Sequence, residues 1–356
     1  MKEYICTVIL LLFSLITLIT LVGRNKVLYK FVKSGLILSS ALVMACAVAE
    51  VIGVVFGGGF FTVPLVFKTA KYIEICTTPL VPIALIKVFT LKSSIPAVFI
   101  PSIIHIALQT LSLFFGFMFY IDQNCNFRYG NFYWLYYLTI AVNILFLFVE
   151  AIKFSRKLQS RNYSSIIMII IFIIIGSVFH IVDNEVRILW LTVTIGLILL
   201  YIYYCNMVYQ IEPTTMLLNR RAYDTHKILL NKRAYIIVFD VNNFKDINDK
   251  FGHITGDSYL KFVANAIKTV YGKIGLCYRV GGDEFCVITD RKTHATDVER
   301  LNEKFSKLLA DKNIMAEYAP SVAIGYEFFD DKKSNIYEVI KSADKKMYIN
   351  KTNKKS

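Results

Sequence analysis

The sequence from Leu276 to Thr289, LCYRVGGDEFCVIT, decides the fold of the C-terminal part of the chain. Its two ends, Leu276–Val280 and Phe285–Thr289, are short apolar runs of the kind that form β-strands. Between them stands the tetrapeptide Gly281-Gly282-Asp283-Glu284. Paired glycines supply the positive φ angles that a tight hairpin turn needs. The stretch therefore predicts a β-hairpin with two carboxylates at its tip.

Further elements flank this hairpin on both sides. Before it come an apolar β-rich run, Ala234–Asp240, and a helical segment from Asp257 whose apolar residues recur on one face. After it come a helix over Val298–Leu309, a strand over Ser321–Phe328 and a last helix over Ile336–Asn350. The order β-α-β-β-α-β predicts an α/β (α+β) domain with a ferredoxin-like sheet.

Several motifs in this region resemble those of one protein family. The run Tyr278–Phe285 looks like the signature of the GGDEF family, the diguanylate cyclases. The resemblance covers about residues 212–355 and implies a GGDEF domain over 209–356. The other matching motifs, at family-like spacing, are Asp240–Asp249 (DVNNFKDIND), Phe251-Gly252-His253, Gly256-Asp257, the entry segment Leu217–Tyr223, and Ala343-Asp344, Met347-Tyr348 and Lys351 in the terminal helix.

The acidic residues of these motifs suit a metal site. Nucleotidyl transfer requires a hard divalent cation held by oxygen ligands. Asp240 ends one strand, and adjacent strands could bring it close to Asp283 and Glu284. The resemblance implies Mg²⁺, which Mn²⁺ could replace, held by Asp240, the Val241 carbonyl and Asp283, with Glu284 as a further ligand. The alternative is an acidic turn on an ordinary α/β surface.

The resemblance also implies catalytic and substrate-binding roles. The catalytic set is Asp283, as the base for a ribose hydroxyl, with Glu284 beside it and Lys245, which stabilises the transition state. Five residues are implied to bind the GTP substrate: Asn248, His253 and Asp257 near the guanine, and Lys351 and Lys355 at the β- and γ-phosphates. For Lys355, a basic tail without a role is an equally open alternative.

Some positions depart from the family pattern. Asn242 stands where the family usually has an acidic residue, and Ala323 replaces its strand serine. Thr214 and Met216 weaken the family's Asp-x-Leu-Thr-Gly entry motif, although Glu212 keeps the charge. The product-inhibition motif R-x-x-D is absent, because Gly272-Lys273-Ile274-Gly275 occupies its place. We therefore expect no feedback inhibition through that site.

The implied activity is the condensation of two GTP molecules into cyclic di-GMP with release of two pyrophosphates. Each site holds one GTP, so two domains must face each other in a homodimer. The alternative is a catalytically silent GTP-binding scaffold that signals through protein contacts, which the fold alone does not exclude.

The N-terminal part of the chain is far more apolar. The whole chain is 56% hydrophobic and 19% charged, with a mean hydropathy of +0.52, and a membrane-spanning helix needs about 20 apolar residues. Seven stretches qualify and predict an all-α transmembrane bundle, a sensor or anchor domain over residues 1–208: Tyr4–Val22, Ser34–Phe56, Val66–Ile86, Ile95–Phe119, Phe132–Ala151, Tyr163–Val182 and Ile188–Val208.

Basic residues in the loops predict the orientation. Ten Lys and Arg lie in the loops after the first, third and fifth stretches, against five on the opposite side. The positive-inside rule therefore places the N-terminus outside the cell membrane and everything after Tyr209 in the cytoplasm. The same clustering explains the net charge of +14 without a nucleic-acid partner. A transporter would need internal repeats, which the seven unequal stretches do not show.

Ionisable residues inside the spans indicate a function by default, because their burial in lipid is costly. They could line an outward-facing pocket for an unknown sensory ligand. Alternatively they pair with one another, as Lys71 and Glu74 could, and only fix helix packing. The residues in question are Glu50, Glu74, His105, His180 and Asp183.

Overall fold

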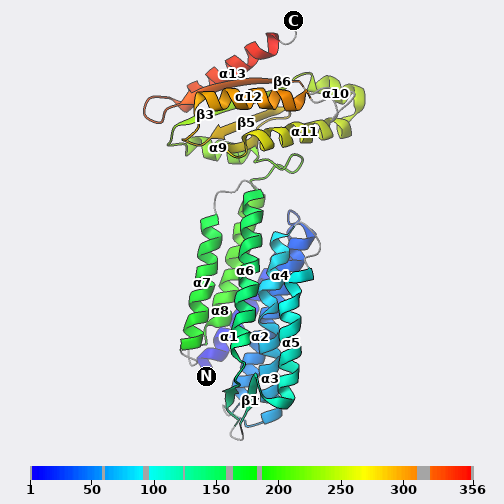
Figure 1. Cartoon of the computed structure of the whole chain (residues 1–356), viewed down its shortest axis with the longest axis vertical. Helices are drawn as coiled ribbons and strands as arrows, with labels where there is room; N and C mark the ends of the chain where they lie inside the picture. Colours follow the sequence, from blue (N-terminus) through cyan, green and yellow to red (C-terminus); the bar gives the residue numbers. More distant parts are fainter. Residues whose placement is uncertain are drawn as a thin grey trace. The chain divides into compact units, whose positions relative to one another are not determined.

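A computed structural model shows the architecture of the chain (Figure 1). It describes residues 2–57, 61–90, 96–122, 125–157, 163–182, 187–310 and 321–353. The chain divides into two compact units, residues 1–208 and 209–356. The first is helical with one small hairpin, and the second is an α/β sheet domain.

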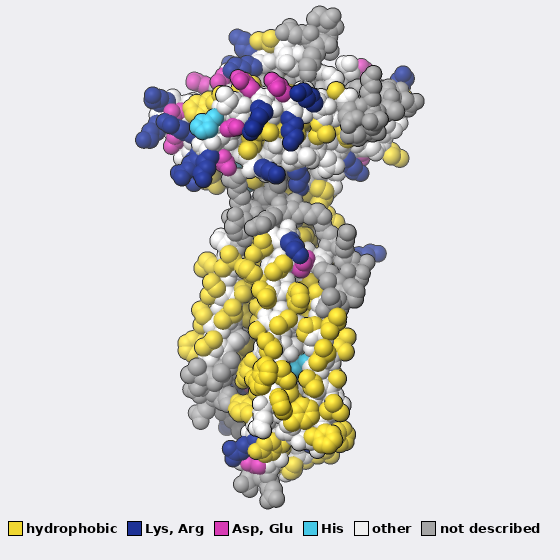
Figure 2. Space-filling view, in the orientation of Figure 1, with side chains coloured by type: hydrophobic (Ala, Val, Ile, Leu, Met, Phe, Trp, Pro, Cys, Tyr) yellow, Lys and Arg dark blue, Asp and Glu magenta, His cyan; other side chains and the backbone are white. Residues whose placement is uncertain are grey.

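The N-terminal unit is a bundle of apolar helices. Figure 2 shows the face of this bundle in view covered mainly by hydrophobic side chains. Within the described residues, six helical segments are long and apolar enough to cross a membrane, and Ser164–Phe179 is a shorter apolar helix. The elements are α1 (Lys2–Arg24), α2 (Lys30–Phe56), α3 (Pro64–Thr77), α4 (Leu80–Phe89), α5 (Pro96–Phe115), β1 (Phe119–Ile121), β2 (Phe127–Tyr129), α6 (Trp134–Lys157), α7 (Tyr163–Val182) and α8 (Leu189–Val208).

The third predicted span is two helices rather than one. The break between α3 and α4 lies at Pro79, which has no N–H to donate to the Ile75 carbonyl. The His105 ring instead places Nε2 3.2 Å from that carbonyl oxygen, and the Asn143 side-chain amide donates to the Pro79 carbonyl over 2.9 Å. Both side chains are buried. Polar groups from α5 and α6 thus satisfy the backbone at the break.

The predicted fourth span, Ile95–Phe119, was too long at its C-terminal end. Helix α5 ends at Phe115 because Gly116 adopts a left-handed φ of +69°, a common way to end a helix. Phe119 instead begins β1, which pairs antiparallel with β2.

The C-terminal unit has the predicted ferredoxin-like fold. Its four strands are all antiparallel to their neighbours and lie in the order β4-β5-β3-β6. The elements are α9 (Arg220–Ile228), β3 (Ala234–Val241), α10 (Phe244–Phe251), α11 (His253–Tyr271), β4 (Gly275–Arg279), β5 (Glu284–Thr289), α12 (Ala295–Leu309), β6 (Val322–Phe329) and α13 (Ile336–Asn353).

The sheet is buried on both faces. Strand β3 alternates, so that Ile237 and Phe239 pack against α11 and α12, whereas Ile236 and Val238 pack against α9 and α13. This explains why β3 is a continuous apolar run rather than an alternating one. Asp240 follows the run near the end of the strand.

The predicted hairpin between β4 and β5 is present, but the predicted role of its glycines was wrong. Among the described glycines only Gly116 and Gly252 have a positive φ. At Gly281 an added Cβ would lie 2.6 Å from the Glu284 carboxylate, so the Glu284 side chain would have to shift. Gly282 faces open space. The turn is closed by the Val280 N–H, which donates to the Glu284 carbonyl over 2.9 Å.

Candidate functional site

The ends of β3 and β5 bring the predicted metal ligands into one region. Asp240 is the direct antiparallel partner of Glu284, and the Val241 N–H donates to the Asp283 carbonyl over 3.1 Å. The two strands therefore hold the backbones of all four residues side by side. This edge offers carboxylate and carbonyl oxygens, which are the ligands that Mg²⁺ prefers.

A cation already neutralises Asp240. Lys351, on α13, places Nζ 2.5 Å from Asp240 Oδ1, and the Asp240 side chain is only 13% exposed. The contact thus places a positive charge beside a carboxylate that is shielded from water. Within the described residues no three acidic, His or Cys side chains gather as a ready metal cage.

The predicted guanine-binding residues lie where α10 meets α11. Asn248 is partly buried on α10, whereas His253 and Asp257 are exposed on the first turns of α11. A Cβ at Gly256 would lie 1.9 Å from Asn248 Oδ1, so only glycine lets the Asn248 amide pack against α11. Gly252, with φ +81°, provides the sharp turn between the helices. Asn248 is thereby held beside the helix turn that carries Asp257.

The predicted cationic residues differ in their surroundings. Lys245 is exposed at the start of α10 and has no ion pair within the described part of the chain. Such a side chain is available to a negatively charged ligand. Lys351 reaches the carboxylate edge, as described above, and Lys355 lies outside the described residues.

The departures from the family pattern have local explanations. The Asn242 side-chain amide donates to Ser321 Oγ over 2.8 Å, and Ala323 is fully buried opposite Asp240. The Asn242 Oδ1 atom is buried without a hydrogen-bond partner. Met216 adopts φ +59°, a conformation that glycine takes more easily. Met216 therefore carries backbone strain at a position where the family has glycine.

Sequence reasoning missed how the hairpin is supported. Arg279 forms an ion pair of 3.1 Å with Glu212 and donates two hydrogen bonds, of 2.8 and 3.2 Å, to the Gly282 carbonyl. Arg279 therefore connects Glu212, which precedes the entry segment, with the turn that carries Asp283. Both residues were visible in the sequence, but their pairing depends on how the entry segment lies along β4.

The Glu212 carboxylate is strongly held. It accepts hydrogen bonds from the Thr214 and Thr215 N–H groups, at 3.1 and 2.7 Å, and from the Thr215 hydroxyl. Burial alone would raise the pKa of Glu212, but these hydrogen bonds and the Arg279 charge outweigh burial and lower it. Glu212 is thus ionised at neutral pH and anchors the entry turn.

Comparisons with known proteins find relatives of the C-terminal part of the chain. Residues 210–356 match the family model described as "Diguanylate cyclase, GGDEF domain". Diguanylate cyclase DgcP of Escherichia coli K12 is 30% identical over 35% of this chain and 37% of its own length. The uncharacterized membrane protein SH2145 of Staphylococcus haemolyticus is 31% identical over 34% of this chain and 35% of its own length. The chain thus matches about a third of the length of these curated relatives.

A solved structure is also similar to part of the chain. The GGDEF domain of DgcB from Caulobacter crescentus, in complex with c-di-GMP, is 26% identical, with a TM-score of 0.37. The likeness covers 41% of this chain and 89% of that one.

Proposed function

We propose that this chain, whose residues 210–356 form a GGDEF domain related to the diguanylate cyclases, is a membrane-bound diguanylate cyclase. It would condense two GTP molecules into cyclic di-GMP and release two pyrophosphates. The observation that carries the proposal is the register of Asp240 with Glu284, beside Asp283 and within reach of Lys351. Acidic residues and a cation meet there at one sheet edge, as nucleotidyl transfer requires.

The residues at this edge would have different roles in catalysis. Bound Mg²⁺, held by Asp240, the Val241 carbonyl, Asp283 and Glu284, would supply positive charge to the phosphates. Asp283 accepts the proton of the ribose 3′-hydroxyl. The 3′-oxygen then attacks the α-phosphorus of the second GTP. The bond from that phosphorus to the bridging oxygen breaks and pyrophosphate leaves. Lys245, exposed and without a described ion pair, stabilises the negative charge that develops.

Guanine selection would come from the α10–α11 corner. The Asp257 carboxylate can accept both the N1 and the N2 hydrogens of guanine, a donor pair that adenine lacks. Asn248 can add a further hydrogen bond, and His253 lies on the same turn as Asp257. Lys351 and Lys355 would bind the β- and γ-phosphates, so that Lys351 exchanges its Asp240 contact for the substrate.

Catalysis requires two copies of the chain. One domain activates the hydroxyl of its own GTP, and the reciprocal attack closes the ring. A twofold arrangement presents the same surface on both partners, which lets both attacks occur in one geometry. A homodimer is therefore part of the proposal.

The N-terminal helices would anchor the enzyme in the cell membrane as a multi-pass protein and receive a signal. Six described segments have the length and hydropathy of membrane spans. The excess of Lys and Arg in alternate loops supports an external N-terminus and a cytoplasmic GGDEF domain. In that orientation the site has access to cellular GTP.

The test is product identification with the full chain in lipid nanodiscs. GTP and Mg²⁺ should yield cyclic di-GMP by mass spectrometry, and Asp283→Asn should lower the rate at least 100-fold. Asp331→Asn, the same change at an exposed site, should not. If a folded, dimeric wild-type protein binds GTP but forms no product, the scaffold alternative holds instead.

A further inference from the structure

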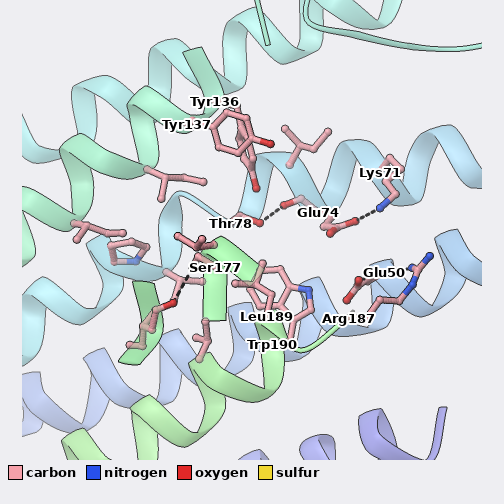
Figure 3. A pocket seen from close by; sticks show the side chains of 18 of the residues that line it. Glu50, Lys71, Glu74, Thr78, Tyr136, Tyr137, Ser177, Arg187, Leu189 and Trp190 are labelled. Carbon is pink, nitrogen blue, oxygen red and sulfur yellow. Dashed lines mark hydrogen bonds and ion pairs between the residues drawn. The ribbon is translucent and has the colours of Figure 1, made fainter. Parts of the chain in front are cut away.

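The N-terminal unit contains a cavity that the proposed catalytic function does not use. Its volume is about 700 Å³, within the usual range of small-molecule sites. Side chains from α2, α3, α4, α6, α7 and α8 line it (Figure 3). The cavity therefore lies within the helical bundle.

Four charged residues lie at one end of this cavity, as Figure 3 shows. Lys71 forms a direct ion pair of 2.8 Å with Glu74, whereas the contact between Arg187 and Glu50 is longer, at 3.8 Å. The Glu50 and Glu74 side chains are 3% and 10% exposed, and the cations are 33% and 21% exposed. The acids are thus buried more deeply than the cations that accompany them.

Glu50 has no cation within hydrogen-bond distance in the described part of the chain. The contact with Arg187 is 3.8 Å, too long for a hydrogen bond, and the neighbouring Tyr4 phenol is a neutral group that does not balance the charge of Glu50. A carboxylate withdrawn from water gains strongly from a positive charge that also donates a hydrogen bond. An ammonium group entering the cavity would meet both requirements.

Trp190 provides a second, independent sign of a ligand. Its side chain lines the cavity and is only 4% exposed, and its Nε1–H has no hydrogen-bond partner within the described residues. A buried N–H donor without an acceptor costs free energy, so this atom favours a ligand oxygen. One ligand could therefore satisfy Trp190 and Glu50 together.

Most of the remaining cavity wall is aromatic or aliphatic, with the hydroxyl side chains of Thr78 and Ser177 as exceptions. Tyr136 and Tyr137 lie on α6 and Tyr133 immediately precedes it, and ring faces of this kind attract cations. Aliphatic side chains such as Leu85 and Val193 surround the remaining volume. This wall suits an apolar body attached to the charged group.

We propose that this cavity binds an organic cation, namely an amine with an apolar body and one oxygen acceptor. The ammonium contacts Glu50, the oxygen accepts from Trp190, and the apolar body fills the aliphatic part. A ligand with a carboxylate head would fit Arg187 but would place its charge against the two more deeply buried acids. The sign of charge thus favours the amine.

Only some of the residues that the sequence suggested for such a pocket are described as lining this cavity. Glu50 and Glu74 line the cavity, as expected under the pocket interpretation. His105 does not line it and instead contacts the Ile75 carbonyl. His180 and Asp183 lie outside the described side chains.

The test uses three probes of similar shape and different charge. These are 3-phenoxypropylamine, neutral 3-phenoxypropan-1-ol and 4-phenoxybutanoate, titrated calorimetrically into the full chain in phosphatidylcholine nanodiscs. We expect the amine to bind saturably and at least tenfold more tightly than the other two. Glu50→Gln should weaken the amine at least tenfold. Glu150→Gln is the matched control, because Glu150 pairs with exposed Lys153 and does not line the cavity.

A second comparison tests the oxygen contact. Trp190→Phe should weaken 3-phenoxypropylamine several-fold but leave 4-phenylbutylamine, which has a methylene in place of the ether oxygen, unchanged. Thermal unfolding without probe would show that each variant is folded. Tighter binding of the carboxylate, equal effects of the Glu50 and Glu150 changes, or no saturable amine binding would overturn the proposal. None of these readouts depends on cyclase activity.

Discussion

Lys351 and Asp240 are 111 residues apart in sequence and form an ion pair with 2.5 Å between Nζ and Oδ1. The pair joins the last helix to the central strand of the sheet at the proposed catalytic edge. We expect Lys351→Met to raise the KM for GTP at least tenfold, because both the phosphate contact and the charge opposite Asp240 are lost. Steady-state kinetics would measure this.

The control for Lys351 is Lys345→Met, on the same helix. Lys345 is exposed and has no ion pair within the described residues. Its removal should leave the KM within about twofold of wild type. An equal rise in KM for both variants would show that α13 contributes only general positive charge.

The Glu212 anchor predicts a pH-dependent stability. Its folded-state pKa lies below its ordinary value of 4.5, so its contribution is complete above that value and is lost as the pH falls through the folded pKa. Glu212→Gln should cost about 1–3 kcal/mol at pH 7 and much less at about pH 3. Thermal unfolding of the C-terminal unit within the full chain would test this.

Glu303→Gln provides the comparison for Glu212, since Glu303 is exposed and has no described partner. That variant should unfold like wild type at both pH values. A Glu212→Gln penalty that stays constant with pH would contradict the role of its ionised form.

The absent R-x-x-D motif predicts a cyclase without product inhibition at that site. Gly275 occupies the position of the motif's aspartate, and a Cβ there would lie 2.5 Å from the Ile288 carbonyl oxygen. Initial rates should therefore not fall when micromolar cyclic di-GMP is added. Installing the motif as Gly272→Arg with Gly275→Asp should lower the unfolding temperature, because backbone must move, and should not restore inhibition. Inhibition of the wild-type enzyme would contradict the prediction.

The contact between His105 and the Ile75 carbonyl predicts a non-additive pair of variants. His105→Leu should destabilise the N-terminal unit by about 1–3 kcal/mol, because it leaves a buried carbonyl without a donor. Pro79→Ala restores the N–H that can donate to Ile75. In that background the cost of His105→Leu should be smaller. Equal costs, measured by thermal unfolding in nanodiscs, would place the effect of His105 elsewhere.

The sequence predicted the sheet domain well because its signals are local. The apolar run of β3, the hairpin and the helix faces each depend on residues close together in the chain. The sequence predicted that adjacent strands could bring Asp240 close to Glu284, but the direct register of the two residues is known only from the structure. The glycine conformations did not follow, because a dipeptide alone does not distinguish positive φ from close packing. At Gly281 an added Cβ would instead meet the Glu284 side chain, a contact within one turn.

Long-range side-chain contacts were beyond prediction from the sequence. Arg279 forms its ion pair with Glu212 only because the entry segment lies along β4. His105 contacts the Ile75 carbonyl only because their helices pack together. The same limit explains why the ionisable residues of the spans were predicted as a group, whereas among the described ones Glu50 and Glu74 line the cavity and His105 does not. Periodicity places a residue on a helix face but does not identify the neighbouring helix.

The entry segment also has a consequence for shortened versions of the C-terminal unit. Strand β4 is the outer strand of its sheet, and Leu218 covers part of its free edge: the Leu218 N–H donates to the Cys277 carbonyl and the Arg279 N–H to the Leu218 carbonyl. A fragment that starts beyond Leu218 would expose unpaired backbone groups along that strand. Unpaired strand edges form hydrogen bonds with strands of other chains, so the shortened protein should self-associate and precipitate.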